Sequence, residues 1–277
     1  MNGTEECYEP WSCAGFRGRA LSGWAAAVGD REPLSTLLEH PHETVKSRRG
    51  KLVYRIDLGG RVIYAKRTWG SPAVPGFRAR LDALRRLARP SRAMKVWRTH
   101  RAMVRAGLSV PRILAAGYRR RGLDAEDLVI SQEVAGQGFA RVLVAADSDG
   151  QRRLMRRLGR SLARMHRAGW YHGDPGFRNI VIAEGARCCW LDNDHTRWLP
   201  DWAAGAARRH NLGVITHQAL WRCRSMHVRT FFEAYGRVLG WEPAPLVAMM
   251  RSALAFARAR SRLPGRGRRP YGEAINI

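Results

Sequence analysis

Lysine and acidic residues are both scarce in this sequence. Its 277 residues include 49 Lys and Arg but only 23 Asp and Glu, so the formal net charge is +26 at pH 7, and just four of the basic residues are lysines. The acids gather near the start: residues 1–45 have a net charge of −4, and the remainder has +30. A field of this size attracts polyanions such as nucleic acid, anionic lipid head groups or a phosphorylated substrate, and the charge alone does not choose among them.

Long apolar runs are missing as well. No stretch approaches the roughly 18 consecutive apolar residues of a membrane-spanning helix. The first ten residues contain three glutamates and no Lys or Arg, whereas a signal peptide begins with basic residues and continues into an apolar segment. We therefore expect a cytoplasmic protein whose contact with a membrane is peripheral.

Regularly spaced cysteines are absent too. The five cysteines are odd in number and include no C-x-x-C, which favours reduced thiols over metal ligands or a disulfide scaffold. The chain is 45% hydrophobic, which excludes a disordered or collagen-like polymer. Its length predicts one large domain or two lobes.

The first half of the chain contains short β-branched and aromatic runs. Two of them, within residues 51–67, flank Gly59 and Gly60, and a glycine pair between such runs predicts an antiparallel hairpin. A helix is expected over 76–106, with Ser91 as the cap of its second part. Two further strands are expected at 110–118 and 128–134, separated by a charged turn at 119–127.

The second half is expected to be mostly helical. Leucine and methionine recur at spacings of four, four and three from 154 to 165, which predicts an amphipathic helix that ends at Gly169. A short hairpin and three more helices are expected at 180–191, 203–222, 225–238 and 243–260. The predicted organisation is an acidic N-terminal extension (1–45), a β-rich N-terminal lobe (46–134), a mostly helical C-terminal lobe (135–260) and a basic C-terminal tail (261–277).

A motif with the spacing of a phosphotransferase follows the amphipathic helix. Within H-G-D-P-G-F-R-N, Asp174 precedes Asn179 by five residues, and Asp192 lies on the next hairpin. Kinase-like enzymes use this order: the first Asp accepts the proton of the attacking hydroxyl, and the Asn and the later Asp hold Mg²⁺ against the triphosphate of ATP with hard oxygen ligands. His172 is expected to brace this loop rather than to take part in catalysis.

Lys66 lies on the second strand of the predicted hairpin, where a lysine of such enzymes contacts the α- and β-phosphates of ATP. Each of these residues also has a structural alternative. Lys66 can be an exposed strand residue, and Asp174 can cap a turn. Asn179 can satisfy backbone groups, and Asp192 can pair with a neighbouring arginine. Their order and spacing together favour the kinase interpretation.

These segments resemble the lipopolysaccharide core sugar kinase family, the Kdo and heptose kinase group of protein-kinase-like enzymes. The resemblance covers roughly residues 46–240 and leaves both ends unexplained. The matching pieces lie at 62–67, 89–97, 106–111, 162–166, 171–174 with Asn179, 191–194 and 209–212.

The resemblance implies an α+β, protein-kinase-like fold with a small β-rich N-lobe and a mostly helical C-lobe. It implies ATP-dependent phosphorylation of a Kdo or heptose hydroxyl of the lipopolysaccharide inner core, at the cytoplasmic face of the inner membrane of a Gram-negative bacterium. The implied partners are a lipopolysaccharide core or lipid-linked sugar acceptor and an anionic membrane surface, and no specific nucleic acid is expected. The implied site consists of the catalytic Asp174, the ATP contacts Lys66, Glu133 and Val134, and the Mg²⁺ ligands Asn179 and Asp192.

Two features depart from the kinase pattern. No G-x-G-x-x-G precedes Lys66, so a shorter loop has to cover the phosphates. Val96 stands where the kinase helix often has the glutamate that pairs with the strand lysine. Either another acid, such as Asp82 or Asp192, takes that part, or activity is lower than in the family. Val96→Glu is accordingly expected to be tolerated or activating.

Two other functions stay open on the sequence alone. An atypical protein kinase, or an antibiotic or small-metabolite phosphotransferase, would use the same fold, because the helical lobe rather than the ATP machinery chooses the acceptor. The second open function is that of a pseudokinase that binds anionic lipid or nucleic acid through its arginines. The intact Asp174, Asn179 and Asp192 argue against it.

Overall fold

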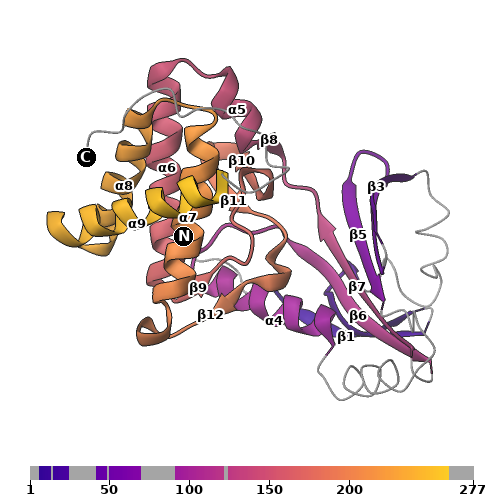
Figure 1. Cartoon of the computed structure of the whole chain (residues 1–277). Helices are drawn as coiled ribbons and strands as arrows, with labels where there is room; N and C mark the ends of the chain where they lie inside the picture. The colour runs from indigo at the N-terminus through magenta and orange to yellow at the C-terminus, as the bar shows by residue number, and fades with distance from the viewer. Residues whose placement is uncertain are drawn as a thin grey trace. The chain divides into compact units, whose positions relative to one another are not determined.

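The structure of the chain is a computed structural model that describes residues 6–13, 15–24, 42–48, 50–69, 91–121 and 124–261. The chain divides into two compact units (Figure 1). The N-terminal unit comprises Met1–Arg101 and Pro111–Glu133, and the C-terminal unit comprises Ala102–Val110 and Val134–Ile277. The bounds of the expected lobes stay a prediction, and nearly all of the expected basic tail lies outside the described residues.

An antiparallel sheet forms the N-terminal unit, and within the described ranges it has seven strands in the order β1-β2-β6-β7-β5-β4-β3. Their bounds are β1 (Tyr8–Cys13), β2 (Phe16–Leu21), β3 (His42–Arg48), β4 (Lys51–Asp57), β5 (Val62–Trp69), β6 (Ile113–Arg121) and β7 (Asp124–Gln132). The predicted hairpin is confirmed, because β4 pairs with β5 around a turn in which Gly59 and Gly60 have φ angles of 63° and 85°. Only glycine adopts positive φ at two successive positions with so little cost.

Two strands, and the beginning of a third (β3), lie in the segment that we expected to precede the sheet as an acidic extension. β1 pairs with β2, and β2 pairs with β6, so residues 8–21 belong to the sheet. Trp11 and Phe16 are buried there in one cluster with Ile63 and Ile130. Burying such a side chain stabilises a fold by about 2 kcal/mol, and this gain ties the segment to the sheet despite the acids around it.

β6 ends three residues later than the sequence predicts, and β7 begins four residues earlier. The segment 119–127, expected as a charged turn, is mostly strand, and Arg119 pairs with Glu126 across the ladder. The Glu126 carboxylate accepts hydrogen bonds from Arg119 Nη2 (2.5 Å) and from Arg67 Nε (2.7 Å). Opposite charges on facing strands stabilise a ladder, so this charged sequence continues the sheet.

The helix α4 (Arg92–Arg105) is capped at the residue that the sequence predicts. Ser91 Oγ accepts a hydrogen bond from Met94 N–H (3.2 Å). The Asp127 carboxylate accepts one from the Ser91 hydroxyl (2.5 Å) and one from Ala93 N–H (3.0 Å). These bonds satisfy N–H groups that a helix N-terminus leaves without intrahelical partners. The earlier part of the expected helix lies outside the described residues.

The C-terminal unit consists of helices and two small sheets. Its helices are α5 (Phe139–Ala145), α6 (Ser148–Arg167), α7 (Gly205–Leu220), α8 (Ser225–Leu239) and α9 (Pro243–Ser261). One sheet contains β8 (Gly136–Gly138), β10 (Ile180–Ala183) and β11 (Arg187–Trp190), and the other contains β9 (Trp170–Tyr171) and β12 (Arg197–Trp198). α6 packs against α8, and α7 packs against α9 (Figure 1). The expected hairpin at 180–191 and the three later helices are thereby confirmed.

α6 has the amphipathic pattern that the sequence predicts. Leu154, Leu158 and Leu162 are buried in the core of the C-terminal unit together with Phe231 of α8. The chain leaves the helix at Gly169, whose φ is 77°. Within the described ranges, no helix is both long and apolar enough to cross a membrane.

Candidate active site

The loop that carries Asp174 runs from His172 to Asn179, between β9 and β10. The side chain of Asn211 on α7 makes two hydrogen bonds to the backbone of His172, where this loop begins. His172 N–H donates to Asn211 Oδ1 (3.1 Å), and Asn211 Nδ2 donates to the His172 carbonyl (2.7 Å). The same Oδ1 is 3.1 Å from His166 Nε2. One buried amide of α7 therefore positions the loop.

His166 is fully buried beside this amide. Because Asn211 Oδ1 is an acceptor, His166 Nε2 carries the hydrogen and Nδ1 accepts from the Tyr235 hydroxyl (2.8 Å). Burial lowers the pKa of His166 to about 3, so the imidazole is neutral at physiological pH. Asn211 lies in the matching piece 209–212, but no local pattern indicates its contacts or those of Tyr235, because their partners lie 39 to 69 residues away in the chain.

The His172 side chain links the loop of Asp174 to the segment of Asp192. Its Nδ1 accepts a hydrogen bond from Asp174 N–H (3.0 Å), and its Nε2 donates to the Leu191 carbonyl (2.8 Å). A backbone N–H can only donate and a carbonyl can only accept, so this geometry requires the neutral ring with hydrogen on Nε2. Burial lowers the pKa of His172, consistent with that state. The geometry agrees with the bracing role that the sequence suggests.

Asn179 and Asp192 lie at the same end of the β10–β11 hairpin. Ile180 pairs with Trp190 at the end of the ladder, and Leu191 N–H donates to the Asn179 carbonyl (2.8 Å). Asn179 Nδ2 donates to the Asp174 carbonyl (2.8 Å), so Oδ1 is the atom of this amide that can bind a cation. The structure thus brings the loop of Asp174 and Asn179 next to the segment of Asp192.

Asp192 has an unusual backbone conformation, with φ of 54° and ψ of 51°. This left-handed region is sparsely populated by residues other than glycine, though Asp and Asn adopt it more readily than most. The Asp192 side chain is exposed, whereas Asp194, two residues later, is 8% exposed. Non-glycine residues in this conformation concentrate at functional sites.

These two residues fit a Mg²⁺ ion in the donor atoms that they offer. Mg²⁺ in phosphotransferases binds one or two protein oxygens and completes its shell with phosphate oxygens and water. Asn179 Oδ1 and the Asp192 carboxylate supply such oxygens. Over the described ranges, no group of three or more His, Cys, Asp or Glu side chains forms a metal cage.

Arg178 sets the charge state of Asp174. Burial alone would raise the pKa of Asp174, but the hydrogen bond from Arg178 Nη2 to Asp174 Oδ2 (2.5 Å) and the positive charge of Arg178 outweigh it and hold the pKa below its usual value. Asp174 is then an ionised carboxylate over a wide pH range, as a proton acceptor must be.

The residues expected to contact ATP lie on both sides of the unit boundary along the chain. Lys66 is on β5, where it pairs with Val53 of β4 and Val129 of β7. Glu133 follows β7 in the N-terminal unit, and its carboxylate accepts a hydrogen bond from the Tyr64 hydroxyl (3.1 Å). Val134 is the first residue after the boundary, in the same unit as Asp174, Asn179 and Asp192. The roles of all six residues remain predictions.

Comparison with known families identifies the chain. The model of the lipopolysaccharide kinase (Kdo/WaaP) family matches residues 41–235, which is more than half of the sequence. The chain belongs to this family. The resemblance that the sequence motifs indicate is thereby confirmed.

Curated relatives in the Kdo/WaaP family are named 3-deoxy-D-manno-octulosonic acid kinase. The protein from Xylella fastidiosa (strain M23) is 27% identical over 137 residues, which cover 47% of this chain and 51% of that protein. The protein from Stenotrophomonas maltophilia (strain R551-3) is 34% identical over 120 residues, 43% of each. The chain thus spans about half the length of the curated relatives that it matches.

A solved structure entitled "WaaP in complex with acyl carrier protein" is similar over 85% of this chain and 97% of that one, with a TM-score of 0.58 and 18% identity. At this identity the similarity concerns the fold. The predicted α+β, protein-kinase-like fold, with a β-rich N-terminal part and a mostly helical C-terminal part, is confirmed.

Arg178→Gln is expected to move the acidic limb of the pH–kcat/KM profile to higher pH. Without Arg178 the pKa of Asp174 rises, so the carboxylate becomes protonated, and activity is lost, at a pH where the original chain still works. The measurement is kcat/KM as a function of pH. Arg229→Gln is the matched control, because Arg229 pairs with Glu233 at the same four-residue spacing (2.9 Å) in α8. An acidic limb that both variants leave unchanged would contradict this role of Arg178.

Val96 lies in an apolar cluster, which corrects the expectation for Val96→Glu. It is 7% exposed and is buried with Ala93, Ile113 and Ala116. Val129, which pairs with the lysine of β5, packs against this cluster, so Lys66 lies on the same sheet face. Of the acids that we considered as its partner, Asp82 lies outside the described residues and Asp192 belongs to the other unit.

We now expect Val96→Glu to lower the free energy of unfolding by at least about 2 kcal/mol, because it buries a carboxylate among apolar side chains. Urea unfolding measures this, with Val144→Glu as the control, since Val144 is 63% exposed on α5. If Val96→Glu is as stable as the control and raises kcat, the new carboxylate has formed an ion pair, and the expectation from the sequence was right.

Proposed function

We propose that this chain transfers the γ-phosphoryl group of ATP to a hydroxyl of a lipopolysaccharide inner-core sugar, and that this sugar is 3-deoxy-D-manno-octulosonic acid (Kdo). The observation that carries the proposal is the position of His172 in a chain of the Kdo/WaaP family. Its ring hydrogen-bonds both the backbone of Asp174 and the carbonyl of Leu191, so it joins the loop of Asp174 to the segment of Asp192. The names of the curated relatives support Kdo over heptose as the acceptor.

In the proposed reaction Asp174 accepts the proton of the acceptor hydroxyl, whose oxygen then attacks the γ-phosphorus. The bond from that phosphorus to the bridging oxygen breaks, and ADP leaves. Asn179 and Asp192 would hold Mg²⁺, which when bound neutralises charge on the phosphates. Lys66, Glu133 and Val134 remain the proposed contacts with ATP.

The test uses the full chain with ATP, Mg²⁺ and four acceptors: a Kdo-bearing lipid A precursor, a heptose-bearing core without a free Kdo hydroxyl, an aminoglycoside and a general protein substrate. We expect ADP release and phosphate transfer with the first. Transfer only to the heptose acceptor would change the sugar, and transfer only to the aminoglycoside or the protein would favour the other kinase classes. An absence of ATP binding and turnover would favour the pseudokinase.

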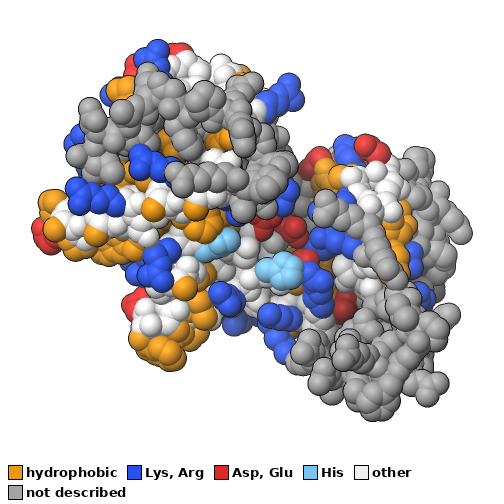
Figure 2. Space-filling view, viewed as in Figure 1, with side chains coloured by type: hydrophobic (Ala, Val, Ile, Leu, Met, Phe, Trp, Pro, Cys, Tyr) orange, Lys and Arg blue, Asp and Glu red, His pale blue; other side chains and the backbone are white. Residues whose placement is uncertain are grey.

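We also propose that the chain works at an anionic membrane surface, from the cytoplasmic side. Lys and Arg side chains outnumber acidic ones on the face shown in Figure 2. The exposed side of α6 is strongly basic and carries Arg152, Arg153, Arg156, Arg157, Arg160, Arg164 and Arg167. Each basic residue near such a surface contributes about 1 kcal/mol to binding.

Neutralising four of these arginines is expected to weaken binding to vesicles that contain anionic lipid by about 10² to 10³-fold at low salt. Co-sedimentation measures it for the quadruple variant Arg153→Gln, Arg156→Gln, Arg160→Gln and Arg164→Gln. The control replaces four exposed arginines of α8 and α9, namely Arg229, Arg237, Arg251 and Arg258. An equal loss in both would mean that only net charge matters, and binding that is insensitive to salt would contradict the membrane proposal.

A further inference from the structure

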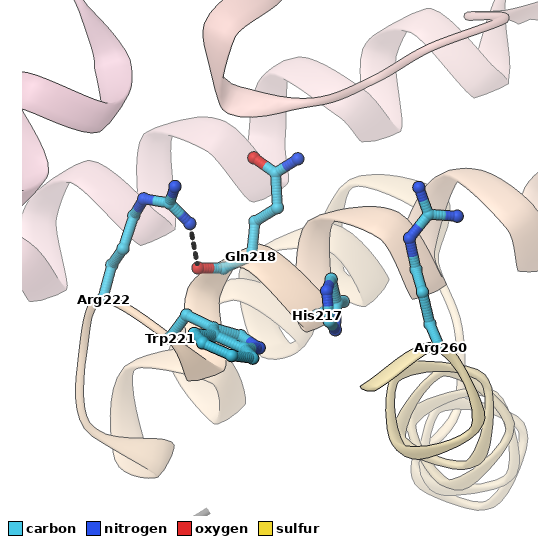
Figure 3. Close-up of a pocket in the computed structure, with 5 residues that line it drawn as sticks. All are labelled: His217, Gln218, Trp221, Arg222 and Arg260. Atoms are coloured by element: carbon cyan, nitrogen blue, oxygen red, sulfur yellow. Dashed lines mark hydrogen bonds between the residues drawn. The ribbon is translucent and has the colours of Figure 1, made fainter. Parts of the chain in front are cut away.

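A pocket of about 430 Å³ lies in the C-terminal unit, apart from the residues assigned above. Its lining residues in the described chain are His217, Gln218, Trp221, Arg222 and Arg260, from α7, the turn after it and α9 (Figure 3). Arg222 and Arg260 stand at opposite ends of this group, with Gln218 and His217 between them (Figure 3). None of the five is acidic. A pocket of this volume suits a small ligand such as one sugar residue.

Arg222 is held in place before any ligand binds. Its Nη1 donates to the Gln218 carbonyl (3.1 Å; Figure 3), and its guanidinium lies 5.8 Å from the centroid of the buried Phe177 ring. The indole N–H of Trp221 is buried and has no hydrogen-bond partner among the described residues. A buried N–H without an acceptor lowers the stability of a fold, so such groups normally have a hydrogen-bond partner. The oriented guanidinium of Arg222, the second arginine and the unsatisfied N–H together suit a ligand that is an anion and a hydrogen-bond acceptor.

The pocket borders the loop of Asp174. Gln218 Oε1 accepts a hydrogen bond from Phe177 N–H (2.7 Å), within that loop. A Cβ atom on Gly176 would lie 2.9 Å from Gln218 Nε2 and 3.4 Å from Asp174 Oδ1, so Gly176 lies between these two side chains. A side chain at residue 176 would therefore press on both.

The charges of Arg260 on α9 and of Asp174 both act on His210. Burial lowers the pKa of His210, the positive charge of Arg260 lowers it further, and the negative charge of Asp174 opposes the change. The pKa of His210 therefore depends on both charges. The distances around Gly176 place Gln218, a lining residue of the pocket, close enough to Asp174 for one sugar molecule to reach both.

We infer that this pocket binds the carboxylate of the acceptor sugar acid and so directs one of its hydroxyls to Asp174. The inference rests on the proposed function and deepens it, because it names the acidic group that the site recognises. Arginine binds carboxylates through two parallel N–H···O bonds, which orient the bound group as well as holding it. Two arginines and no acidic side chain line the described part of this pocket, so it favours a sugar acid over a neutral heptose.

The first experiment changes the ligand and leaves the protein intact. Calorimetry compares the binding of free Kdo with that of its carboxyl methyl ester. We expect the ester to bind about 10- to 100-fold more weakly, as expected when a neutral acceptor replaces a charged one in hydrogen bonds to arginine. Equal affinities would overturn the inference. Loss of Kdo binding on adding inorganic phosphate at an equally low concentration would also overturn it, since the site would then be one for phosphate.

The second experiment changes the pocket. Arg222→Gln and Arg260→Gln are each expected to weaken Kdo binding about 10-fold or more and to weaken ester binding much less, because the ester is a neutral acceptor without the carboxylate charge. Trp221→Phe should have a smaller effect in the same direction. The matched control is Arg258→Gln, an exposed arginine of α9 that does not line the pocket. If this control weakens Kdo binding as much, the effect is general charge and the inference fails. Thermal unfolding checks that each variant is folded.

Phosphate transfer separates this inference from the function beneath it. If Kdo binds with the expected dependence on its carboxylate and on both arginines but receives no phosphate, the inference stands and the proposed function fails. A different result is that Kdo is phosphorylated, its methyl ester binds as tightly as Kdo, and the arginine variants bind Kdo as tightly as the original chain. The function then stands and the inference fails. In the expected case the variants raise the KM for Kdo and leave the KM for ATP unchanged.

Discussion

Asp174→Asn is expected to lower kcat about 10² to 10⁴-fold while leaving the KM for ATP within a few-fold, because it removes the proposed proton acceptor and keeps the rest of the loop. Asparagine has the same shape, and its Oδ1 can still accept the hydrogen bond that Arg178 donates. The backbone N–H of residue 174 can still donate to His172 Nδ1. A steady-state assay of phosphate transfer, with ATP and Kdo acceptor varied separately, measures the effect.

Asp201→Asn is the control for that experiment. Asp201 is an exposed carboxylate of the same unit, 3.4 Å from Arg208, so its replacement removes the same charge away from the loop. We expect near-normal kinetics for this control. Full activity in Asp174→Asn would sink the proposed mechanism, and a matching loss in Asp201→Asn would show that net charge, not proton transfer, is responsible.

Asp192→Asn is expected to cost about 10²-fold or more in kcat/KM for Mg·ATP, comparable with the loss of other groups that stabilise charge in a transition state. Asparagine also tolerates the left-handed backbone found at this position, so the turn should persist and thermal unfolding should change little. A titration of the rate with Mg²⁺ measures the effect, and higher Mg²⁺ should restore part of the activity. Asn179→Ala should act in the same direction with a smaller loss, since an amide supplies no full charge.

A variant of Asp194 tests whether Asp192 or Asp194 is the ligand of the proposed metal site. It is buried, so Asp194→Asn is expected to change thermal stability more than the dependence on Mg²⁺. If Asp194→Asn removes the dependence on Mg²⁺ and Asp192→Asn does not, the ligand is Asp194 and the assignment from spacing is wrong by two residues.

Elements with local signals were predicted well. The β4–β5 hairpin depends on two glycines at its turn, and α6 on a repeat of leucines with helical spacing. Both signals act between residues near in sequence, so they need no knowledge of the rest of the fold. Ser91 as a helix cap belongs to the same class.

Elements that depend on distant partners were missed. Arg17 of β2 pairs with Tyr118 of β6, about a hundred residues later. No sequence pattern around residue 17 predicts that pairing. The charged segment 119–127 has the composition of a turn, and its strand conformation depends on Arg67, Arg119 and Glu126 meeting across three strands. Propensity is a weak guide where tertiary contacts of this kind act.

The sequence by itself determined the chemistry that this chain can offer: an Asp, an Asn and an Asp at kinase spacing, a strand lysine, and a large excess of arginine. It determined them because the order and type of these candidate residues can be read directly along the chain. Only the tertiary structure decided how these residues are held and what lies beside them. The amide of Asn211 reaches a backbone 39 residues earlier, Gln218 reaches Phe177 across 41 residues, and Arg260 joins Arg222 around one pocket. Such contacts depend on how helices pack against each other, and no periodicity or local spacing encodes which side chains then meet.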